Sequence, residues 1–302
     1  MIAAQLRRIG RRIAVVVLRP ATVRRSARLL TRRGFVPQAL WLRLPVDADF
    51  PVAVPGGSSF LYRSSAGDGV GRALYWRGLR GYEPETVAIF SSLARAARTV
   101  VDVGAHAGVF TLLACAVNPE IRVIAFEPVP GLVAALERNL ALNGWTQRCD
   151  IRRLAAADLI GSLPLRVPAG GAPVGATLAE PRHRSLDEHT IVVQTTTLDA
   201  AIGPEAGAVD LVKIDVERAE DRVVRGMIGI LHRDRPAIVV ECIRGGPTAS
   251  IEQPLRGLGY RFFHLRDAPV EVDRLEADPG RRWRNYLCLP DSRTLPSPTE
   301  LP

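Results

Sequence analysis

The sequence predicts an α/β fold in which helices cover both faces of a mostly parallel sheet, with a small N-terminal extension. Residues 99–130 carry the first observation: an apolar strand, a glycine-containing turn, an apolar helix and a second apolar strand follow one another. This is the pattern of a βαβ unit. Short apolar segments continue to alternate with helical patterns as far as residue 289. The chain has 302 residues, of which 47% are hydrophobic, enough for one large α/β domain.

Positive charge is concentrated in residues 1–35. This segment has ten arginines (positions 7, 8, 11, 12, 19, 24, 25, 28, 32 and 33) and no acid. Because it contributes +10 to a net charge of +9, the charges of the remaining residues sum to −1. A basic nucleic-acid groove on that remainder is therefore not expected. The apolar run Ile13–Leu18 is too short to span a bilayer or to form a signal peptide. Residues 1–35 are either a basic helix contacting an anionic membrane or a partner, or a partly disordered, solubilising leader.

Residues 36–82 predict a small β appendage. Prolines and the Gly56-Gly57 pair separate two strand-like segments, Phe50–Val54 and Ser59–Tyr62. The main domain is predicted to span residues 83–290 and to open with a helix near Pro84, because proline is favoured in a first helical turn. Residues 291–302 are rich in proline and predict a disordered tail.

The turn at residues 102–108 predicts a nucleoside-binding crevice. Gly104 allows a sharp turn and Gly108 a close helix start, while Glu127 follows the second strand, 23 positions after Gly104. An acid near that spacing accepts hydrogen bonds from ribose hydroxyls. The glycines form G-x-x-x-G and not the G-x-G-x-x-G that a pyrophosphate requires. Asp102 would repel a pyrophosphate and suits a ligand carrying an amino group or a cation, so S-adenosylmethionine fits better than NAD.

The next elements follow from the same periodicities. A helix is predicted over Gly131–Asn143, with Gly144 placed to end it and Asn143 able to help fix that end. A third strand is predicted over Ile151–Ala157, followed by Asp158. Strand-like segments at 163–167 and 191–196 predict an inserted hairpin whose loop, residues 170–189, lies on the substrate side.

The last strands bring further acids to the sheet edge. A fourth strand, Val209–Ile214, leads into Asp215 and Glu217, and a fifth, Pro236–Glu241, ends in an acid. Segments 260–265 and 285–289 predict a final antiparallel pair. In an open α/β sheet the ligand lies beyond the carboxyl ends of the strands. Five acids stand at such ends: Asp102, Glu127, Asp158, Asp215 and Glu241.

Five sequence blocks together resemble the FkbM-type S-adenosylmethionine-dependent methyltransferases. They are VDVGAHAG (101–108), AFEP (125–128), LALNG (140–144), LVKIDVERAE (211–220) and IVVEC (238–242). The resemblance covers about residues 82–289 and implies a Rossmann-like class I methyltransferase fold with seven strands and S-adenosylmethionine as cofactor. The cofactor residues it implies are Asp102, Gly104, Ala105, Gly108, Glu127, Pro128, Asn143 and Asp158, the last opposite the adenine amino group. Arg218 stands where the family usually has glycine.

Three residues are candidates for catalysis. Methyl transfer to a hydroxyl needs an aligned acceptor and a group that takes its proton. Asp215 is the first candidate, as base or acceptor-orienting residue, Glu217 the second, and His106, in the cofactor turn, the third. Lys213, the only lysine, could reach this rim or pair with Glu241.

The resemblance favours oxygen methylation of a small molecule, sugar or lipid-linked glycan. The scattered cysteines make a reducing, cytoplasmic setting the default, and residues 1–35 allow peripheral contact with the inner face of the membrane. The alternatives are a non-catalytic, membrane-associated binding module with a degenerate methyltransferase fold, or an NAD(P)-dependent oxidoreductase. The four cysteines are scattered, so no zinc site or disulfide framework is expected. Asp215 and Glu241 could both reach a metal ion, but no histidine cluster supports one.

Overall fold

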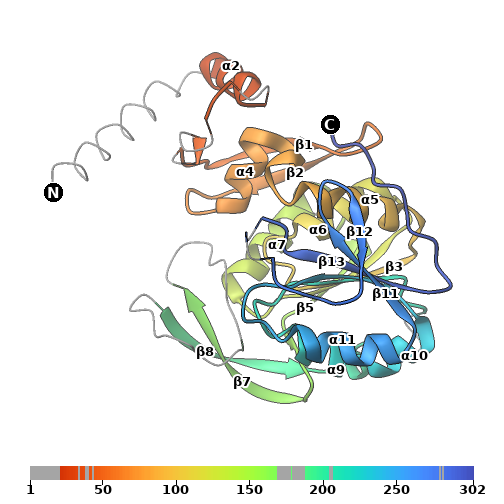
Figure 1. Ribbon diagram of the computed structural model, residues 1–302. Coiled ribbons are helices and arrows are strands. Elements are labelled where there is room, and N and C mark those ends of the chain that lie inside the picture. Colours follow the sequence, from red (N-terminus) through yellow and green to blue (C-terminus); the bar gives the residue numbers. More distant parts are fainter. Residues whose placement is uncertain are drawn as a thin grey trace. The chain divides into compact units, whose positions relative to one another are not determined.

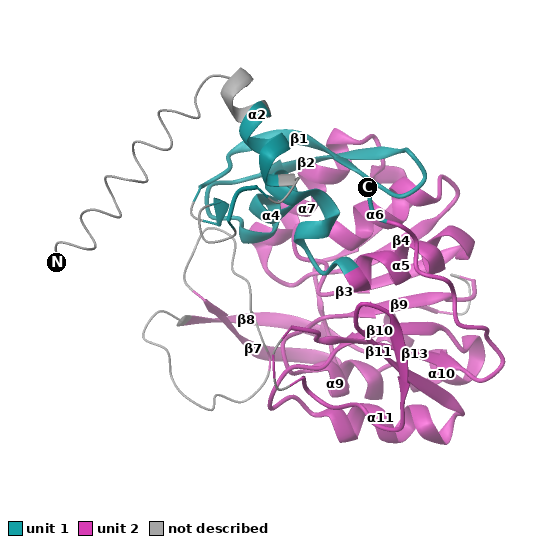
Figure 2. Cartoon of the chain, turned by 45° about the horizontal axis from the view of Figure 1, so that its top comes forward, with its two compact units in different colours: residues 1–84, 170–172, 301–302 teal, residues 85–169, 173–300 magenta. Residues whose placement is uncertain are grey.

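The computed structural model describes residues 21–32, 35–37, 41–42, 44–168, 178, 188–203, 207–278, 280 and 282–302. The chain divides into two compact units (Figure 2). Unit 1 comprises residues 1–84, 170–172 and 301–302, and unit 2 comprises residues 85–169 and 173–300. Most of the predicted loop at residues 170–189 and the first 20 residues lie outside the described part.

Unit 1 is built on a β-hairpin. β1 (Ala48–Ala53) and β2 (Ser59–Ser64) pair antiparallel, which confirms the two predicted strands. The unit also contains helices α2 (Ala21–Arg32), α4 (Gly69–Arg77) and the 3₁₀ turn η1 (Gly78–Gly81). The sequence prediction missed α4 because its glycine-rich start resembles a turn. Asp68 begins that helix by accepting a hydrogen bond from the Gly71 amide at 2.8 Å.

Unit 2 contains a sheet of eight strands in the order β12-β11-β13-β10-β9-β3-β4-β5. These strands are β3 (Thr99–Val103), β4 (Arg122–Phe126), β5 (Cys149–Arg152), β9 (Leu211–Ile214), β10 (Ala237–Glu241), β11 (Tyr260–Leu265), β12 (Pro269–Val272) and β13 (Asn285–Pro290). The five strands from β10 to β5 are parallel, and β13 lies antiparallel between β10 and β11. The predicted final antiparallel pair is therefore confirmed. β12 adds an eighth strand, which the sequence did not predict, by a short hairpin from β11.

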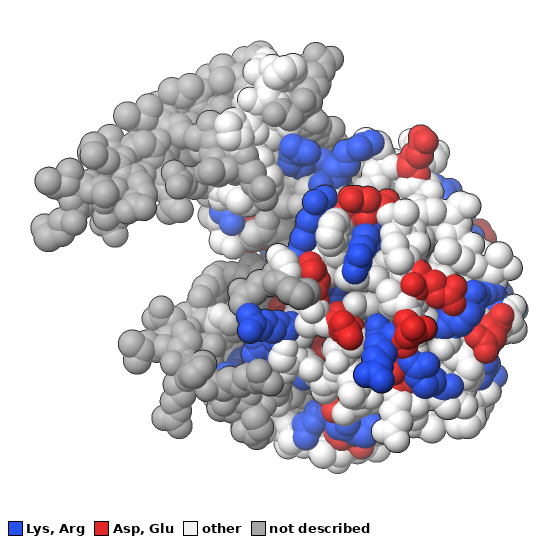
Figure 3. Space-filling model, viewed as in Figure 1, with Lys and Arg blue, Asp and Glu red and all other residues white. Residues whose placement is uncertain are grey.

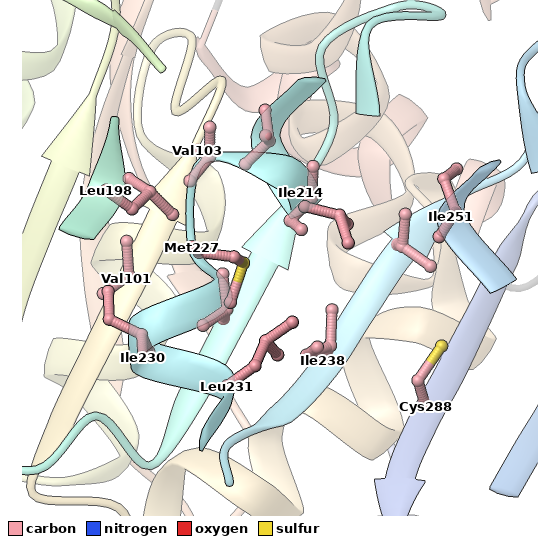
Figure 4. Close-up of a cluster of buried hydrophobic side chains, with 14 of the residues drawn as sticks. Val101, Val103, Leu198, Ile214, Met227, Ile230, Leu231, Ile238, Ile251 and Cys288 are labelled. Atoms are coloured by element: carbon pink, nitrogen blue, oxygen red, sulfur yellow. The ribbon is translucent and has the colours of Figure 1, made fainter. Parts of the chain in front are cut away.

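Helices cover both faces of this sheet (Figure 1). One face carries α5 (Pro84–Ala96), α6 (Val109–Val117) and α7 (Pro130–Leu142), and the other carries α8 (Leu198–Ala201), α9 (Glu220–Arg225), α10 (Ile228–Asp234) and α11 (Thr248–Gly257). Val101 and Val103 of β3 lie in the apolar cluster of the second face together with Leu231 of α10 (Figure 4). Because side chains alternate along a strand, Asp102 points to the opposite face, where α6 lies.

The predicted third strand is two strands in the structure. Residues 149–152 form β5 of the large sheet, whereas β6 (Ala155–Ala156) pairs with β8 (Glu188–Thr196) in a separate three-stranded sheet. β7 (Gly161–Pro168) pairs antiparallel with β8, which confirms the predicted hairpin. The prediction of one strand over Ile151–Ala157 was wrong in its bounds, because a short strand-like pattern does not show where a segment changes its partner.

The C-terminal segment, for which the sequence predicts disorder, follows helix α5 of unit 2 in the structure. The Ser92 hydroxyl donates to the Ser297 carbonyl at 2.6 Å, and the Thr299 amide donates to the Ala88 carbonyl at 3.2 Å. A proline-rich segment lacks many backbone donors of its own, and composition alone does not reveal that a helix hydroxyl and a helix carbonyl bond to this one.

Candidate active site

The turn after β3 has a backbone that requires glycine at two positions. Gly104 and Gly108 have φ angles of +81° and +94°, a region that glycine adopts without steric cost. A Cβ on Gly104 would stand 1.9 Å from the carbonyl oxygen of Asp215, and one on Gly108 would stand 2.4 Å from Cδ1 of Leu136. The amides of Gly104 and Ala105 both donate to the Phe126 carbonyl, at 3.0 and 3.1 Å. The turn is thereby fixed to β4 and in direct contact with the residue after β9.

Glu127 is buried beneath this turn. Its Oε2 accepts a hydrogen bond from the His106 amide and its Oε1 one from the Val129 amide, both at 2.9 Å. Burial is the main reason that the pKa of Glu127 rises to about 7, and the two amide bonds oppose that rise. Each carboxylate oxygen retains a lone pair after these bonds. Glu127 is thus held in one orientation with acceptor capacity for a ligand.

A buried row of charged groups crosses from β3 to β9. Asp102 and Lys213 are register partners on these neighbouring parallel strands, so their side chains lie on the same face of the sheet. The Thr111 hydroxyl donates to Asp102 at 2.6 Å. Burial raises the pKa of Asp102 to about 6, against the effects of the Thr111 hydrogen bond and the Lys213 charge.

Lys213 extends this row to the rim of the sheet. Its ammonium donates to Oδ2 of Asp215 at 3.1 Å, with the lysine side chain 1% exposed and the aspartate 21% exposed. The same ammonium lies 5.0 Å from the centroid of the Phe110 ring, within cation–π range. Lys213 therefore reaches Asp215, one of the two possibilities that the sequence left open.

The loop from Asp215 to Glu220 holds the remaining catalytic candidates. Glu217 and Arg218 have φ angles of +55° and +80°. Burial, followed by the charge of Asp215, raises the pKa of Glu217. Glu220 is 1% exposed and accepts a hydrogen bond from the Arg218 amide at 2.9 Å, and burial raises its pKa to about 7. Glu220 was not among the residues predicted from the sequence. The feature that could have indicated it is an acid in the first turn of a helix directly after the rim acids.

We expect Arg218→Gly to stabilise the fold. Arg218 has a positive φ angle of +80°, which costs a non-glycine residue about 1–2 kcal/mol, partly offset by the greater chain entropy of glycine. Urea denaturation should therefore show a free energy of unfolding higher by about 0.5–1 kcal/mol. The control is Arg222→Gly within helix α9, which should lower it by about 1 kcal/mol. A loss of stability in Arg218→Gly would contradict the expectation.

The structure brings eight of the predicted site residues together. Asp102, Gly104, Ala105, His106, Gly108, Glu127, Asp215 and Glu217 share the turn, the strand ends and their direct contacts. Pro128 is half-buried and follows Glu127 directly. Asn143 lies at the far end of α7, about 20 Å from the first residue of that helix, and its amide group donates to the Asn139 carbonyl at 2.7 Å. It therefore helps to fix the end of α7, and Asn139, which accepts this bond, itself donates to the carbonyl of Ala107 in the glycine turn at 2.8 Å.

Asp158 also has protein partners in the structure. Its carboxylate lies 2.9 Å from the guanidinium of Arg225 and 3.7 Å from that of Arg222, both on α9. Its predicted contact with an adenine amino group thus competes with two ion pairs.

Glu241 lies 3.7 Å from Arg284, and carboxylate oxygens of Asp215 and Glu241 lie within 4.8 Å of each other. A groove of about 960 Å³ lies along α11 and residues 273–276, and no predicted site residue lines it.

Comparisons with known proteins identify the family of this chain. A model of the methyltransferase FkbM domain matches residues 102–262, more than half of the 302 residues. The 31-O-demethyl-FK506 methyltransferase FkbM of Streptomyces tacrolimicus is 29% identical over 269 residues, which is 78% of this chain and 95% of that protein. Methyltransferase sdnD of Sordaria araneosa is 28% identical over 155 residues, and the match covers 42% of this chain and 60% of sdnD.

A solved structure gives a weaker match. Methyltransferase FkbM from Methylobacillus flagellatus KT aligns with a TM-score of 0.42 and 15% identity, over 72% of this chain and 52% of that one. The matched range of the family model contains the glycine turn, Glu127 and the loop after β9. The chain therefore belongs to the FkbM methyltransferase domain family.

Proposed function

We propose that this protein is an S-adenosylmethionine-dependent methyltransferase that methylates a hydroxyl oxygen of a small molecule, sugar or lipid-linked acceptor. The proposal rests on one observation: Gly104 of the glycine turn lies against the backbone of Asp215. The two are so close that a Cβ on Gly104 would stand 1.9 Å from the carbonyl oxygen of Asp215. The turn that would hold the cofactor is therefore next to the carboxylates that would handle the acceptor. The name of the Streptomyces tacrolimicus relative describes methylation at an oxygen, which supports the same acceptor atom.

The residues present fit S-adenosylmethionine. Glu127 has lone pairs for two ribose hydroxyls after its two amide bonds. Buried Asp102 and the rim carboxylate Asp215 suit a ligand that carries an ammonium and a sulfonium group. The turn lacks the glycine spacing that would receive a pyrophosphate, which disfavours NAD. When bound, S-adenosylmethionine supplies an electrophilic methyl group.

The chain's own residues have separate tasks at the acceptor. Asp215 is paired with the buried Lys213 ammonium, and this pair holds its carboxylate in place to orient the acceptor hydroxyl. Glu217 is better suited as base, because burial raises its pKa and a carboxylate with a raised pKa accepts a proton more readily. The proposal therefore makes Glu217 the base and Asp215 the orienting residue, the second of the two roles that the sequence left open for Asp215.

We expect Glu127→Gln to weaken cofactor binding at least tenfold. The amide replaces one acceptor oxygen with a donor and so loses one hydrogen bond to a ribose hydroxyl. Calorimetric titration of the full chain with S-adenosylhomocysteine, and separately with NADH, measures this directly. Glu137→Gln is the matched control, because Glu137 is an exposed acid on α7 that pairs with Arg153.

The titrations also separate the rival functions. Binding of NADH in preference to S-adenosylhomocysteine would refute the proposed cofactor. Binding of S-adenosylhomocysteine without turnover of any alcohol, sugar or lipid-linked acceptor would favour the non-catalytic binding module. Methyl transfer to an alcohol, followed by mass spectrometry of the product, would establish the activity.

A further inference from the structure

The surplus positive charge of this protein belongs to its N-terminal segment. Residues 1–35 carry ten arginines and no acid, whereas the rest of the chain sums to −1. On the face of the molecule shown in Figure 3, basic and acidic side chains of the described residues are interspersed and do not gather by sign. A partner that is attracted by positive charge would therefore be attracted by this segment.

Helix α2 is attached to the folded part of unit 1. The guanidinium of Arg28 donates to the carbonyls of Tyr75 and Pro51, at 2.7 and 3.0 Å, and lies 4.8 Å from the Tyr75 ring centroid. Thr31, on the same helix, is fully buried. These contacts give α2 one face that is directed to the hairpin and α4, and they distinguish it from a free leader.

The helix also exposes large apolar side chains. Leu29 and Leu30 are 51% and 47% exposed, and Phe35 is 73% exposed. The Phe35 amide donates to the Leu30 carbonyl at 3.0 Å, so Phe35 lies beside the end of the helix that carries the two leucines. Three exposed apolar residues thus gather on a segment whose sequence is otherwise basic.

We propose that α2 and Phe35 form a docking surface for an anionic lipid bilayer. Arginine-rich segments are attracted by anionic headgroups, and exposed Leu and Phe on a basic helix insert at the boundary between headgroups and acyl chains. A nucleic acid would satisfy the charges but would leave the leucines and Phe35 in water. No helix in the described part of the chain is both long and apolar enough to cross a membrane.

Flotation of the full-length protein with vesicles tests the proposal. We expect it to float with phosphatidylcholine vesicles that contain phosphatidylglycerol, to remain in solution with phosphatidylcholine alone, and to be released by high salt. The double variant Leu29→Ser/Leu30→Ser should bind the anionic vesicles at least about tenfold more weakly. Leu61→Ser is the matched control, because Leu61 is an exposed leucine of the same unit, on β2, and should bind like the wild type.

Three outcomes would overturn the proposal. They are equal binding to both kinds of vesicle, unchanged binding of the double variant, and no vesicle binding together with salt-sensitive binding of a random DNA duplex. Circular dichroism checks that both variants are folded. The flotation result does not depend on cofactor binding or turnover, so it remains informative if the proposed methyltransferase activity fails.

Discussion

Gly104→Ala is expected to abolish cofactor binding and to lower the free energy of unfolding by roughly 2–5 kcal/mol. The methyl group would stand 1.9 Å from the Asp215 carbonyl oxygen and 2.9 Å from its carbonyl carbon. Both are backbone atoms, so no side-chain rotation can relieve the clash. The residue also has a φ angle of +81°, which adds strain for any side chain. Urea denaturation and calorimetry with S-adenosylhomocysteine measure the two effects.

Gly131→Ala is the control for this variant. Gly131 lies in the first turn of α7, and a Cβ there has no atom within 4 Å. The substitution should raise the free energy of unfolding by about 0.5–1 kcal/mol, with cofactor binding unchanged. If Gly104→Ala bound S-adenosylhomocysteine as tightly as the wild type, the turn would not be the cofactor site.

Much of the fold could be predicted because its local patterns agree with its tertiary structure. The unit from β3 to β4 combines continuous apolar runs with glycines where φ is positive, and both signals are local. Failures occurred where the neighbours of a segment decide its structure. Residues 151–157 were predicted as one strand but contribute to two sheets. Helix α4 was missed for a different reason: its N-cap Asp68 is a local signal, but the glycines that follow it resemble a turn.

The candidate site could be predicted only as a set of strand-end acids. Asp102 and Lys213 are 111 positions apart in the sequence and become neighbours only because β3 pairs with β9. The pairing of Lys213 with Asp215, and the burial that raises the pKa of Glu217, are tertiary effects of the same kind. By contrast, the place of Asn143 at the end of α7 follows from the local pattern, and the sequence predicted it.

Glu217→Gln is expected to lower kcat by about 10²–10⁴-fold, the usual contribution of a general base. The amide keeps the size of the side chain but cannot accept the acceptor's proton. Binding of S-adenosylhomocysteine should remain unchanged, because Glu127 and the glycine turn are untouched. Asp215→Asn serves as comparison: it removes the orienting carboxylate and the negative charge that lies 3.1 Å from the Lys213 ammonium, so it should affect both acceptor KM and stability.

The pH dependence of kcat identifies the base. Only the deprotonated carboxylate of Glu217 can take a proton, and burial raises its pKa above the usual 4.5. Activity should therefore fall as the pH decreases through this raised pKa and reach a plateau above it. Glu217→Gln should remove this acidic limb from the residual activity, whereas Glu137→Gln should keep it. An acidic limb that persists in Glu217→Gln and disappears in Asp215→Asn would instead assign the proton to Asp215.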